Sequence, residues 1–358
     1  MTSIHRRTLL CAALAGLAGA AHARQTSGFV CPPCGCAMDG AVFPDPGLCL
    51  ACGMRLVPAS PAPVEPPALA PGAGMFWAAG GPTRPQRRIG VHYYRPDTFT
   101  PASPILIVLP GAGRDGDEYR DAWIEAAERS GALVAALEYP AADYDFAAYH
   151  MAGLVRDLSF PPGAAASDVV RLRDEDIVFT PNPRPEEWLF GDFDRIFDLL
   201  RTATGSVQTG YDLFGHSAGA QILHRMALAW PDSRARRIVA ANAGFYTLPD
   251  LDAPLLFGLG GSGVDAATLR RGFSSRLILL LGALDDSDEA GGVHLHTPQA
   301  DQQGRGRLSR GRYFHRFAER QAAAMQAPLA WRLEVVPDVA HDFRAMSRAA
   351  ARLLYDTP

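Results

Sequence analysis

The sequence contains no lysine, and it has no cysteine after Cys52. All 34 basic residues among its 358 residues are arginines, which, together with abundant alanine, indicates a codon bias and not a functional choice. Against 38 acidic residues they give a net charge of −4, so no basic excess predicts binding to nucleic acid. Because the six cysteines lie in the first 52 residues, a disulfide framework across the rest of the chain is excluded.

The N-terminal apolar run is too short to span a bilayer. It extends from Leu9 to Ala21, about 13 residues where a spanning helix needs about 20. Arg6-Arg7 precede it and Ala21-His22-Ala23 fits a small-x-small cleavage site, so residues 1–23 are predicted to be a signal peptide. The Arg-Arg-Thr-Leu-Leu segment resembles the twin-arginine signal. We therefore expect a periplasmic or secreted protein without a stable membrane span.

Residues 24–58 form a predicted cysteine-rich module. Cys31, Cys34, Cys49 and Cys52 follow the pattern C-x2-C-x14-C-x2-C, and a glycine directly follows the second cysteine of each pair. This spacing lets four thiolates converge on a tetrahedral zinc ion and leaves no open coordination position. The sequence thus predicts a structural zinc ion and no cofactor for catalysis.

The stretch from Cys31 to Pro58 resembles the heavy-metal-binding domain of metal-efflux proteins. Cys34 stands where that motif usually has a histidine, so copper(I) remains an alternative to zinc. Cys36 is either a spare thiol or an exchangeable ligand. A disulfide-linked knot is the competing interpretation in an oxidising compartment.

The remainder of the chain is predicted to be a Pro/Ala-rich linker, 59–72, followed by one α/β domain, 73–358. Apolar runs alternate with amphipathic stretches, which predicts a mostly parallel sheet with helices on both faces. The expected strands are 88–94, 104–109, 132–137, 211–214, 237–241, 276–281 and 331–336. The expected helices are 118–129, 190–202, 218–230, 312–325 and 342–354. Segment 141–190 breaks this rhythm, and we expect an insertion over the carboxyl edge of the sheet.

The motif Gly215-His216-Ser217-Ala218-Gly219 lies between an expected strand and an expected helix. This is the required context of a nucleophile on a sharp strand–turn–helix elbow. Flanking glycines are needed because side chains there would collide with the neighbouring strand and helix. The N–H of Ala218, at the helix N-terminus, is an expected oxyanion donor.

From these residues the domain resembles an α/β-hydrolase of the esterase and polyhydroxybutyrate-depolymerase-like branch. The resemblance implies the chain order nucleophile, acid, histidine. Asp285 follows an expected strand and is the first choice for the acid; Asp286 and Asp288 are alternatives. His341 follows the last expected strand and is the expected base, with His294 and His296 as alternatives. The loop after 104–109 is expected to supply a second oxyanion donor, Ala112 or Gly113.

The predicted activity is that of an exported serine hydrolase acting on a small-molecule or polymeric ester through an acyl-enzyme. Two alternatives remain: a peptidase of the same fold, and a metal-handling protein that uses the hydrolase domain as a scaffold. Aromatic residues of the 141–190 insertion are expected either in an acyl pocket or in ordinary core. The sequence does not indicate the oligomeric state.

Overall fold

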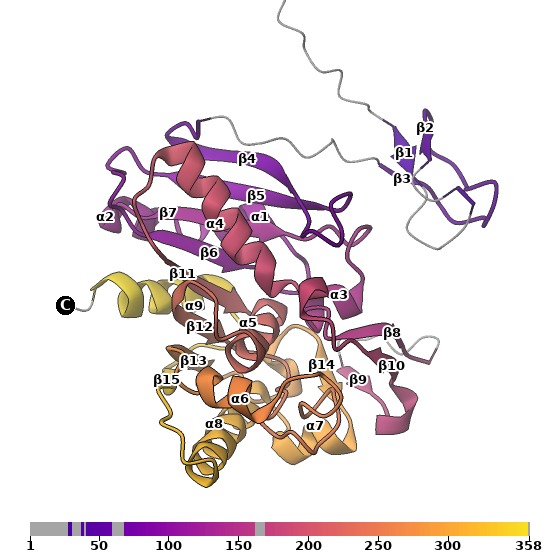
Figure 1. Ribbon diagram of the computed structural model, residues 1–358, viewed down its shortest axis with the longest axis vertical. Helices are drawn as coiled ribbons and strands as arrows, with labels where there is room; N and C mark the ends of the chain where they lie inside the picture. Colours follow the sequence, from indigo (N-terminus) through magenta and orange to yellow (C-terminus); the bar gives the residue numbers. More distant parts are fainter. Residues whose placement is uncertain (1–27, 31–36, 39–40, 59–67, 162–168, 357–358) are drawn as a thin grey trace, which may run out of the picture.

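The computed structural model describes residues 28–30, 37–38, 41–58, 68–161 and 169–356. A single eight-stranded sheet dominates it (Figure 1). The strands run in the order β15 (Arg332–Val336), β13 (Leu277–Gly282), β12 (Ala235–Ala241), β11 (Tyr211–His216), β6 (Ile105–Leu109), β7 (Leu133–Glu138), β5 (Arg88–Arg95) and β4 (Gly72–Ala79). From β15 to β7 every neighbouring pair is parallel, whereas β5 pairs antiparallel with both β7 and β4.

All seven strands expected from the sequence are present, and the sheet has one more. The additional strand, β4, begins at Gly72, the last residue of the predicted linker. Its sequence GAGMFWAA contains five small residues, and Met75 is 39% exposed at this edge of the sheet. The weak apolar pattern of an edge strand with many small residues explains why it was not predicted.

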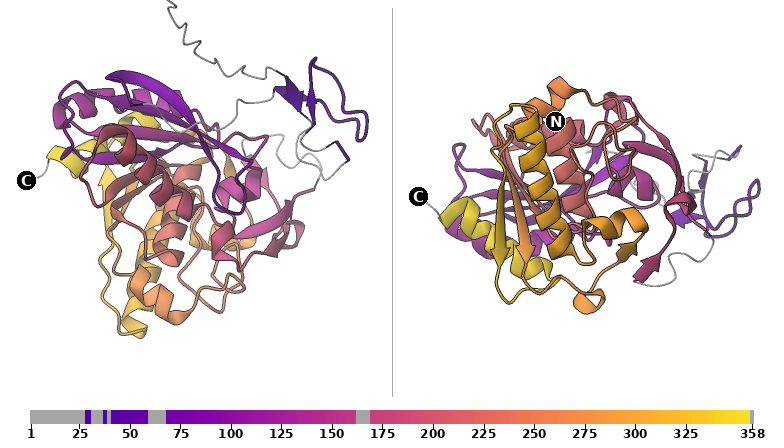
Figure 2. Two further views of the ribbon diagram at one scale, coloured as in Figure 1. Left: turned by 45° about the horizontal axis from the view of Figure 1, so that its top comes forward. Right: turned by 90° about the horizontal axis from the view of Figure 1, so that it is seen from below.

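Helices cover both faces of the sheet, as expected. Ile105, Ile107 and Leu109 of β6 join the core on one face, and Leu106 and Val108 join the core on the other. The first core contains α4 (Phe190–Thr204), α5 (Ala218–Ala229) and α8 (Arg307–Ala324). The second contains residues of α1 (Gly116–Asp121), α2 (Ile124–Ser130) and α9 (Phe343–Ala351), and Figure 2 shows these layers from two further sides. The strands β6 and β13 are buried along their whole length, which is why they are continuous apolar runs in the sequence.

Three helical expectations need correction in their extent. The single helix expected over 118–129 is two short helices, α1 and α2, because the chain turns at Ala122 and Trp123. Trp123 is fully buried in the core there, so packing of this side chain overrides the continuous helical pattern. Helix α8 begins at Arg307, five residues before the expected start, and α9 ends at Ala351 and continues as a π-type turn over Arg352–Asp356.

Segment 141–190 contains irregular structure with three short strands. It holds α3 (Phe146–His150), β8 (Val155–Ser159), β9 (Val169–Arg171) and β10 (Val178–Pro181). Strands β8 and β10 pair with each other, and β9 pairs in parallel with β14 (His294–His296). Two further helices are α6 (Ala266–Gly272), which packs against α5, and α7 (Pro298–Gln303), which contacts β14 and α8.

The described part of the cysteine-rich segment is a small antiparallel sheet in the order β2 (Val42–Phe43), β1 (Phe29–Val30), β3 (Val57–Pro58). Cys49 is buried beside Leu56, and Cys52 is exposed. A tight turn joins them, because the N–H of Gly53 donates to the carbonyl of Cys49 at 2.8 Å and Gly53 has a φ of +72°. The predicted signal peptide, Cys31, Cys34 and Cys36, and most of the predicted linker lie outside the described residues.

None of the helices in the described ranges combines the length and the apolar character that a membrane crossing requires.

Candidate active site

Ser217 occupies the turn between β11 and α5. Its φ of +56° and ψ of −113° are unusual for a residue with a side chain, and its N–H donates to the carbonyl of Ala241 at 2.9 Å. A Cβ atom on Gly215 would lie 2.6 Å from the backbone of Gly219, and a Cβ on Gly219 would overlap the carbonyl of Leu109. Only glycine fits at these two positions. The strained angles of Ser217 cost about 1–3 kcal/mol, and such strain is concentrated at functional sites.

Asp285 and His341 meet at the carboxyl ends of β13 and β15. The His341 Nδ1 lies 2.7 Å from Asp285 Oδ2, and the Asp285 side chain is fully buried. Burial alone would raise the pKa of Asp285, but the hydrogen bond from His341 and the charge of Arg307 hold it below its ordinary value. Burial lowers the pKa of His341, and the Asp285 carboxylate offsets only part of this effect. His341 is therefore a neutral base at neutral pH.

The imidazole of His341 lies beside the nucleophile elbow. Its ring centroid is 4.5 Å from that of His216, the residue before Ser217. His216 is buried, and its Nδ1 lies 3.1 Å from the hydroxyl of Tyr119. The elbow, the base and the acid thus come together from three strand ends that are far apart in sequence.

The alternative acids and bases have other partners. Asp286 is exposed, and its carboxylate accepts a 2.8 Å hydrogen bond from the N–H of Ser309 near the start of α8. Asp288 and His296 contact each other at 2.8 Å, and His294 and His296 both lie on β14. The geometry therefore favours Asp285 and His341 over the alternatives that the sequence leaves open.

The loop after β6 approaches Ser217 as expected. A Cβ on Gly111 would lie 3.6 Å from the Cβ of Ser217, and Ala112 lines the same cavity as Ser217 and Ala218. Gly113 is exposed, and a Cβ there would meet the carboxylate of Asp115. Of the expected oxyanion donors, Ala112 and Ala218 line the cavity together with Ser217, whereas Gly113 is not among the lining residues.

Two further buried residues, Arg307 and Asn242, support the acid and the base of the site. Arg307, the first residue of α8, donates from Nη1 to Asp285 Oδ1 at 2.7 Å and is itself fully buried. Asn242, at the end of β12, accepts from the N–H of Gly282 at 2.8 Å and donates to the carbonyl of Ala340 at 3.2 Å. Asn242 thereby joins the strand end before Asp285 to the loop that carries His341. Sequence reasoning missed Arg307, because a lone arginine 22 residues after the acid belongs to no local motif. The position of Asn242, directly after an expected strand, left it open between a pocket residue and an ordinary loop residue.

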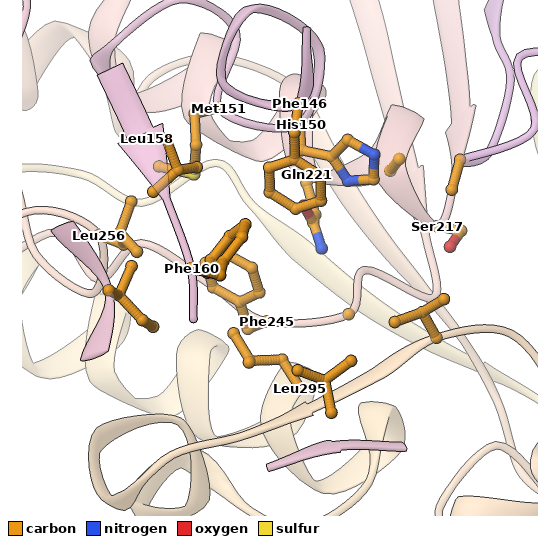
Figure 3. Close-up of a pocket in the computed structure, with 16 residues that line it drawn as sticks. Phe146, His150, Met151, Leu158, Phe160, Ser217, Gln221, Phe245, Leu256 and Leu295 are labelled. Carbon is orange, nitrogen blue, oxygen red and sulfur yellow. The ribbon is translucent and has the colours of Figure 1, made fainter. Parts of the chain in front are cut away.

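A cavity of about 310 Å³ opens beside Ser217 (Figure 3). Ser217 lies at one side of this cavity and Leu256 at the opposite side, with Phe160 and Phe245 between them. The lining residues share a lack of formal charge; they are Ala112, Phe146, His150, Met151, Leu158, Phe160, Val170, Ile177, Ser217, Ala218, Gln221, Gly244, Phe245, Leu256, Val293 and Leu295. Burial, with the charges of Arg114 and Arg225, lowers the pKa of His150 to about 3, so this ring is neutral as well. The cavity suits an apolar group attached to the reacting carbonyl.

Two solved structures are similar to this chain over most of its length. A poly(aspartic acid) hydrolase from Sphingomonas sp. KT-1 is 38% identical, with 80% of this chain and 99% of that chain covered and a TM-score of 0.69. A poly(3-hydroxybutyrate) depolymerase from Bordetella parapertussis is 28% identical, with 80% and 90% covered and a TM-score of 0.69. Neither a protein-family model nor a curated protein matches the sequence.

The fold and the neighbours together define the class of protein. The chain belongs to the α/β-hydrolase superfamily of serine hydrolases. It is an esterase-like serine hydrolase, as the sequence predicted.

Proposed function

We propose that this protein is an exported carboxylic-ester hydrolase that works through Ser217, His341 and Asp285. The observation that carries the proposal is the buried 2.7 Å hydrogen bond between Asp285 and His341, next to a serine held at a strained elbow. In this arrangement Asp285 keeps the proton of the imidazole on Nδ1, which leaves the lone pair of Nε2 for the hydroxyl of Ser217.

In the proposed reaction, the Oγ of Ser217 attacks the acyl carbon while its proton passes to His341. The N–H groups of Ala218 and of Ala112, or of its neighbour Gly113, stabilise the oxyanion of the tetrahedral intermediate. The intermediate collapses when His341 returns the proton to the leaving alkoxide, which departs as an alcohol. Water, deprotonated by His341, then hydrolyses the acyl-enzyme and regenerates the serine.

The lining of the cavity supports an uncharged, apolar acyl group in the substrate. A carboxylate taken from water into this site would have no cationic lining residue to pair with, which is unfavourable. The volume of about 310 Å³ is at the small end for ligand pockets, so we infer a short or medium acyl group. Poly(3-hydroxybutyrate) is an uncharged polyester, whereas poly(aspartic acid) carries carboxylates. The uncharged cavity therefore favours a substrate that resembles the polymer of the depolymerase over one that resembles poly(aspartic acid).

A peptidase of the same fold remains the second candidate, because poly(aspartic acid) is a polyamide and its hydrolase is 38% identical to this chain. Rates with a matched series of esters and amides that share each acyl group separate the two. We expect activity on neutral esters, little on amides, and none on poly(aspartic acid). Amide cleavage at a rate similar to that of the matched ester would replace the esterase proposal with the peptidase.

Labelling with a fluorophosphonate probe tests the nucleophile itself. The full-length protein is expected to be labelled at Ser217, as located by peptide mass spectrometry. A hydrolase domain that serves only as the scaffold of a metal-handling protein would not be labelled.

We further propose a signal peptide over 1–23, a zinc module over 24–58, a linker over 59–72 and the hydrolase domain over 73–358. The Cys49–Cys52 turn supports the module, because Gly53 adopts the positive φ that a Cys-x-x-Cys-Gly metal knuckle needs. Leu69 is buried in the first core and β4 begins at Gly72, which supports a domain boundary a few residues before the predicted end of the linker. Cell fractionation of the native host, with and without Arg6-Arg7→Lys-Lys, tests twin-arginine export.

A further inference from the structure

Beside the hydrolase site, the loop after Asp285 and strand β14 bring together a second group of side chains. Asp288, His294 and His296 each offer one ligand atom, and these three atoms lie within 4.8 Å of one another. His294 and His296 are two residues apart on a strand, so they share one face of it. Val293 and Leu295 alternate with them and line the acyl cavity. The cluster therefore lies behind the cavity wall.

The buried imidazole of His294 lacks hydrogen-bond partners in the described part of the chain. Its side chain is 1% exposed, yet neither ring nitrogen has a hydrogen-bond partner among the described residues. Burying two polar atoms without partners is unfavourable, and such atoms in a native fold call for an explanation.

His296 is held in the way that metal-binding histidines usually are. Its Nδ1 lies 2.8 Å from Asp301 Oδ1, and its Nε2 lies 2.8 Å from Asp288 Oδ1. A carboxylate on the far nitrogen fixes the ring orientation and directs the other nitrogen toward the metal. Both contacts are hydrogen bonds only if both nitrogens carry protons, whereas an ion between Nε2 and Asp288 needs a proton on Nδ1 alone.

The surrounding charges do not exclude a cation. Three arginines lie close by, but each has a carboxylate partner: Arg307 pairs with Asp285, Arg310 with Asp301 and Arg171 with Asp288. An ion that replaces the proton on His296 Nε2 adds only one net positive charge if it is divalent.

We propose that Asp288, His294 and His296 bind one divalent transition-metal ion. Two imidazoles and one carboxylate suit zinc. Bonds of about 2.0–2.2 Å at tetrahedral angles put the ligand atoms about 3.3 Å apart, so the 2.8 Å contact between His296 and Asp288 has to open and the His294 ring has to approach both. The ion joins the loop that carries Asp285 to the strand that forms one wall of the acyl cavity. It is separate from the cysteine site and from the proposed serine chemistry.

Calorimetric titration with Zn²⁺ and visible absorption with Co²⁺ test this site in the full-length chain. Replacing all six cysteines, Cys11, Cys31, Cys34, Cys36, Cys49 and Cys52, by serine removes the competing thiolates. We expect this cysteine variant to bind about one equivalent of Zn²⁺, and its Co²⁺ form to show ligand-field bands without a thiolate charge-transfer band.

In the same background, His294→Ala should abolish binding, and His315→Ala, a histidine deletion on α8, should leave it unchanged. Asp301→Asn should weaken binding by about 10- to 100-fold, as loss of a partner to a ligand histidine does. Circular dichroism tests whether each variant is folded. If the His294→Ala variant is unfolded, Zn²⁺ binding by the Asp288→Asn variant, at a partly exposed residue, tests the site instead. A cysteine variant that binds no Zn²⁺, or equal binding by a folded His294→Ala or Asp288→Asn variant, overturns the proposal.

Discussion

Arg307 donates a hydrogen bond from Nη1 to Oδ1 of Asp285 over 2.7 Å, and both side chains are fully buried. Because the other carboxylate oxygen faces His341, the acid of the proposed triad is held from two sides. The arginine favours the ionised form of the carboxylate, and its charge also lowers the pKa of the neighbouring imidazole. One residue outside the proposed triad therefore influences both the orientation of the acid and the protonation of the base.

Ser217→Ala should abolish ester hydrolysis while the fold is kept. Loss of a triad nucleophile lowers kcat by about 10⁶-fold in a well-studied serine hydrolase. Alanine has no hydroxyl and fits the elbow, so circular dichroism should match that of the wild type. Residual turnover above a tenth of the wild-type rate would remove Ser217 from the mechanism.

Asp285→Asn should reduce kcat far more than Asp286→Asn. An amide at position 285 favours the wrong tautomer of His341, an effect of about 10⁴-fold in a related triad. Asp286 is exposed and only caps the start of α8, so its replacement should lower stability by about 1 kcal/mol and leave kcat within a few-fold. Steady-state kinetics of both variants decide between them, and the reverse order would move the acid to Asp286.

The acidic limb of the pH profile should report His341. Because burial holds its pKa below the ordinary value of 6.5, kcat/KM should be lost only as the pH falls through a midpoint below that value. Arg307→Met removes a charge that lowers this pKa, so the midpoint should move upward. The variant should also lose about 3 kcal/mol of stability, as expected when a buried ion pair is broken.

Arg237→Met is the matched control for Arg307→Met. Arg237 pairs with the buried Asp212 at 2.6 Å, away from the carboxyl ends of the strands. The Arg237→Met variant should be less stable than the wild type, but the pH midpoint of its kcat/KM profile should be unchanged. Equal midpoints in Arg307→Met and the wild type would show that the arginine does not act on the base.

Val170→Phe should shorten the acyl chain that the enzyme accepts. Val170 lines the cavity, so the added ring occupies space that a longer chain needs. With a panel of acyl esters of increasing length, kcat/KM should fall by about 10- to 200-fold for longer chains and little for acetate. Val178→Phe, at a residue that is 60% exposed on β10, makes the same change outside the cavity and should leave the panel unaltered.

Removal of the cysteine ligands should not stop hydrolysis. Cys49→Ser with Cys52→Ser should lower the zinc content of the purified protein by one equivalent, because a four-thiolate site cannot hold its ion on half its ligands. Nothing in the serine mechanism needs that ion, so turnover of small esters should stay close to the wild-type rate. Elemental analysis beside the kinetic assay checks both statements, and a parallel loss of activity would contradict the separation of the two sites.

The parts of this molecule that are local in sequence were predictable, and the parts that depend on distant contacts were not. The strands β6 and β13 are continuous apolar runs, and the elbow at Ser217 has a motif of five consecutive residues. By contrast, Arg307 contacts Asp285 only because the start of α8 packs against the end of β13, and no local pattern carries that information.

The acyl cavity illustrates the same limit. From the sequence, the aromatic residues of the insertion could line a pocket or belong to the core. In the structure some of them do the first and some the second. Phe146 and Phe160 line the cavity, whereas Tyr144, Tyr149 and Trp188 are core residues outside the lining. The choice depends on how α3 and β8 are placed over the sheet, which is a long-range property.

The pairing of β9 with β14 has a consequence for how this enzyme can diversify. Seven of the sixteen cavity-lining residues lie within 141–190, and all of Ser217, Asp285 and His341 lie outside it. Chimeras that exchange this segment between relatives should therefore transfer acyl preference while they keep the reaction. Such an exchange must preserve two contacts between the segment and the rest of the domain. These are the parallel pairing of β9 with β14 and the 2.9 Å ion pair between Arg171 and Asp288. A donor segment is therefore expected to fit best when the donor's own β14 is transplanted with it.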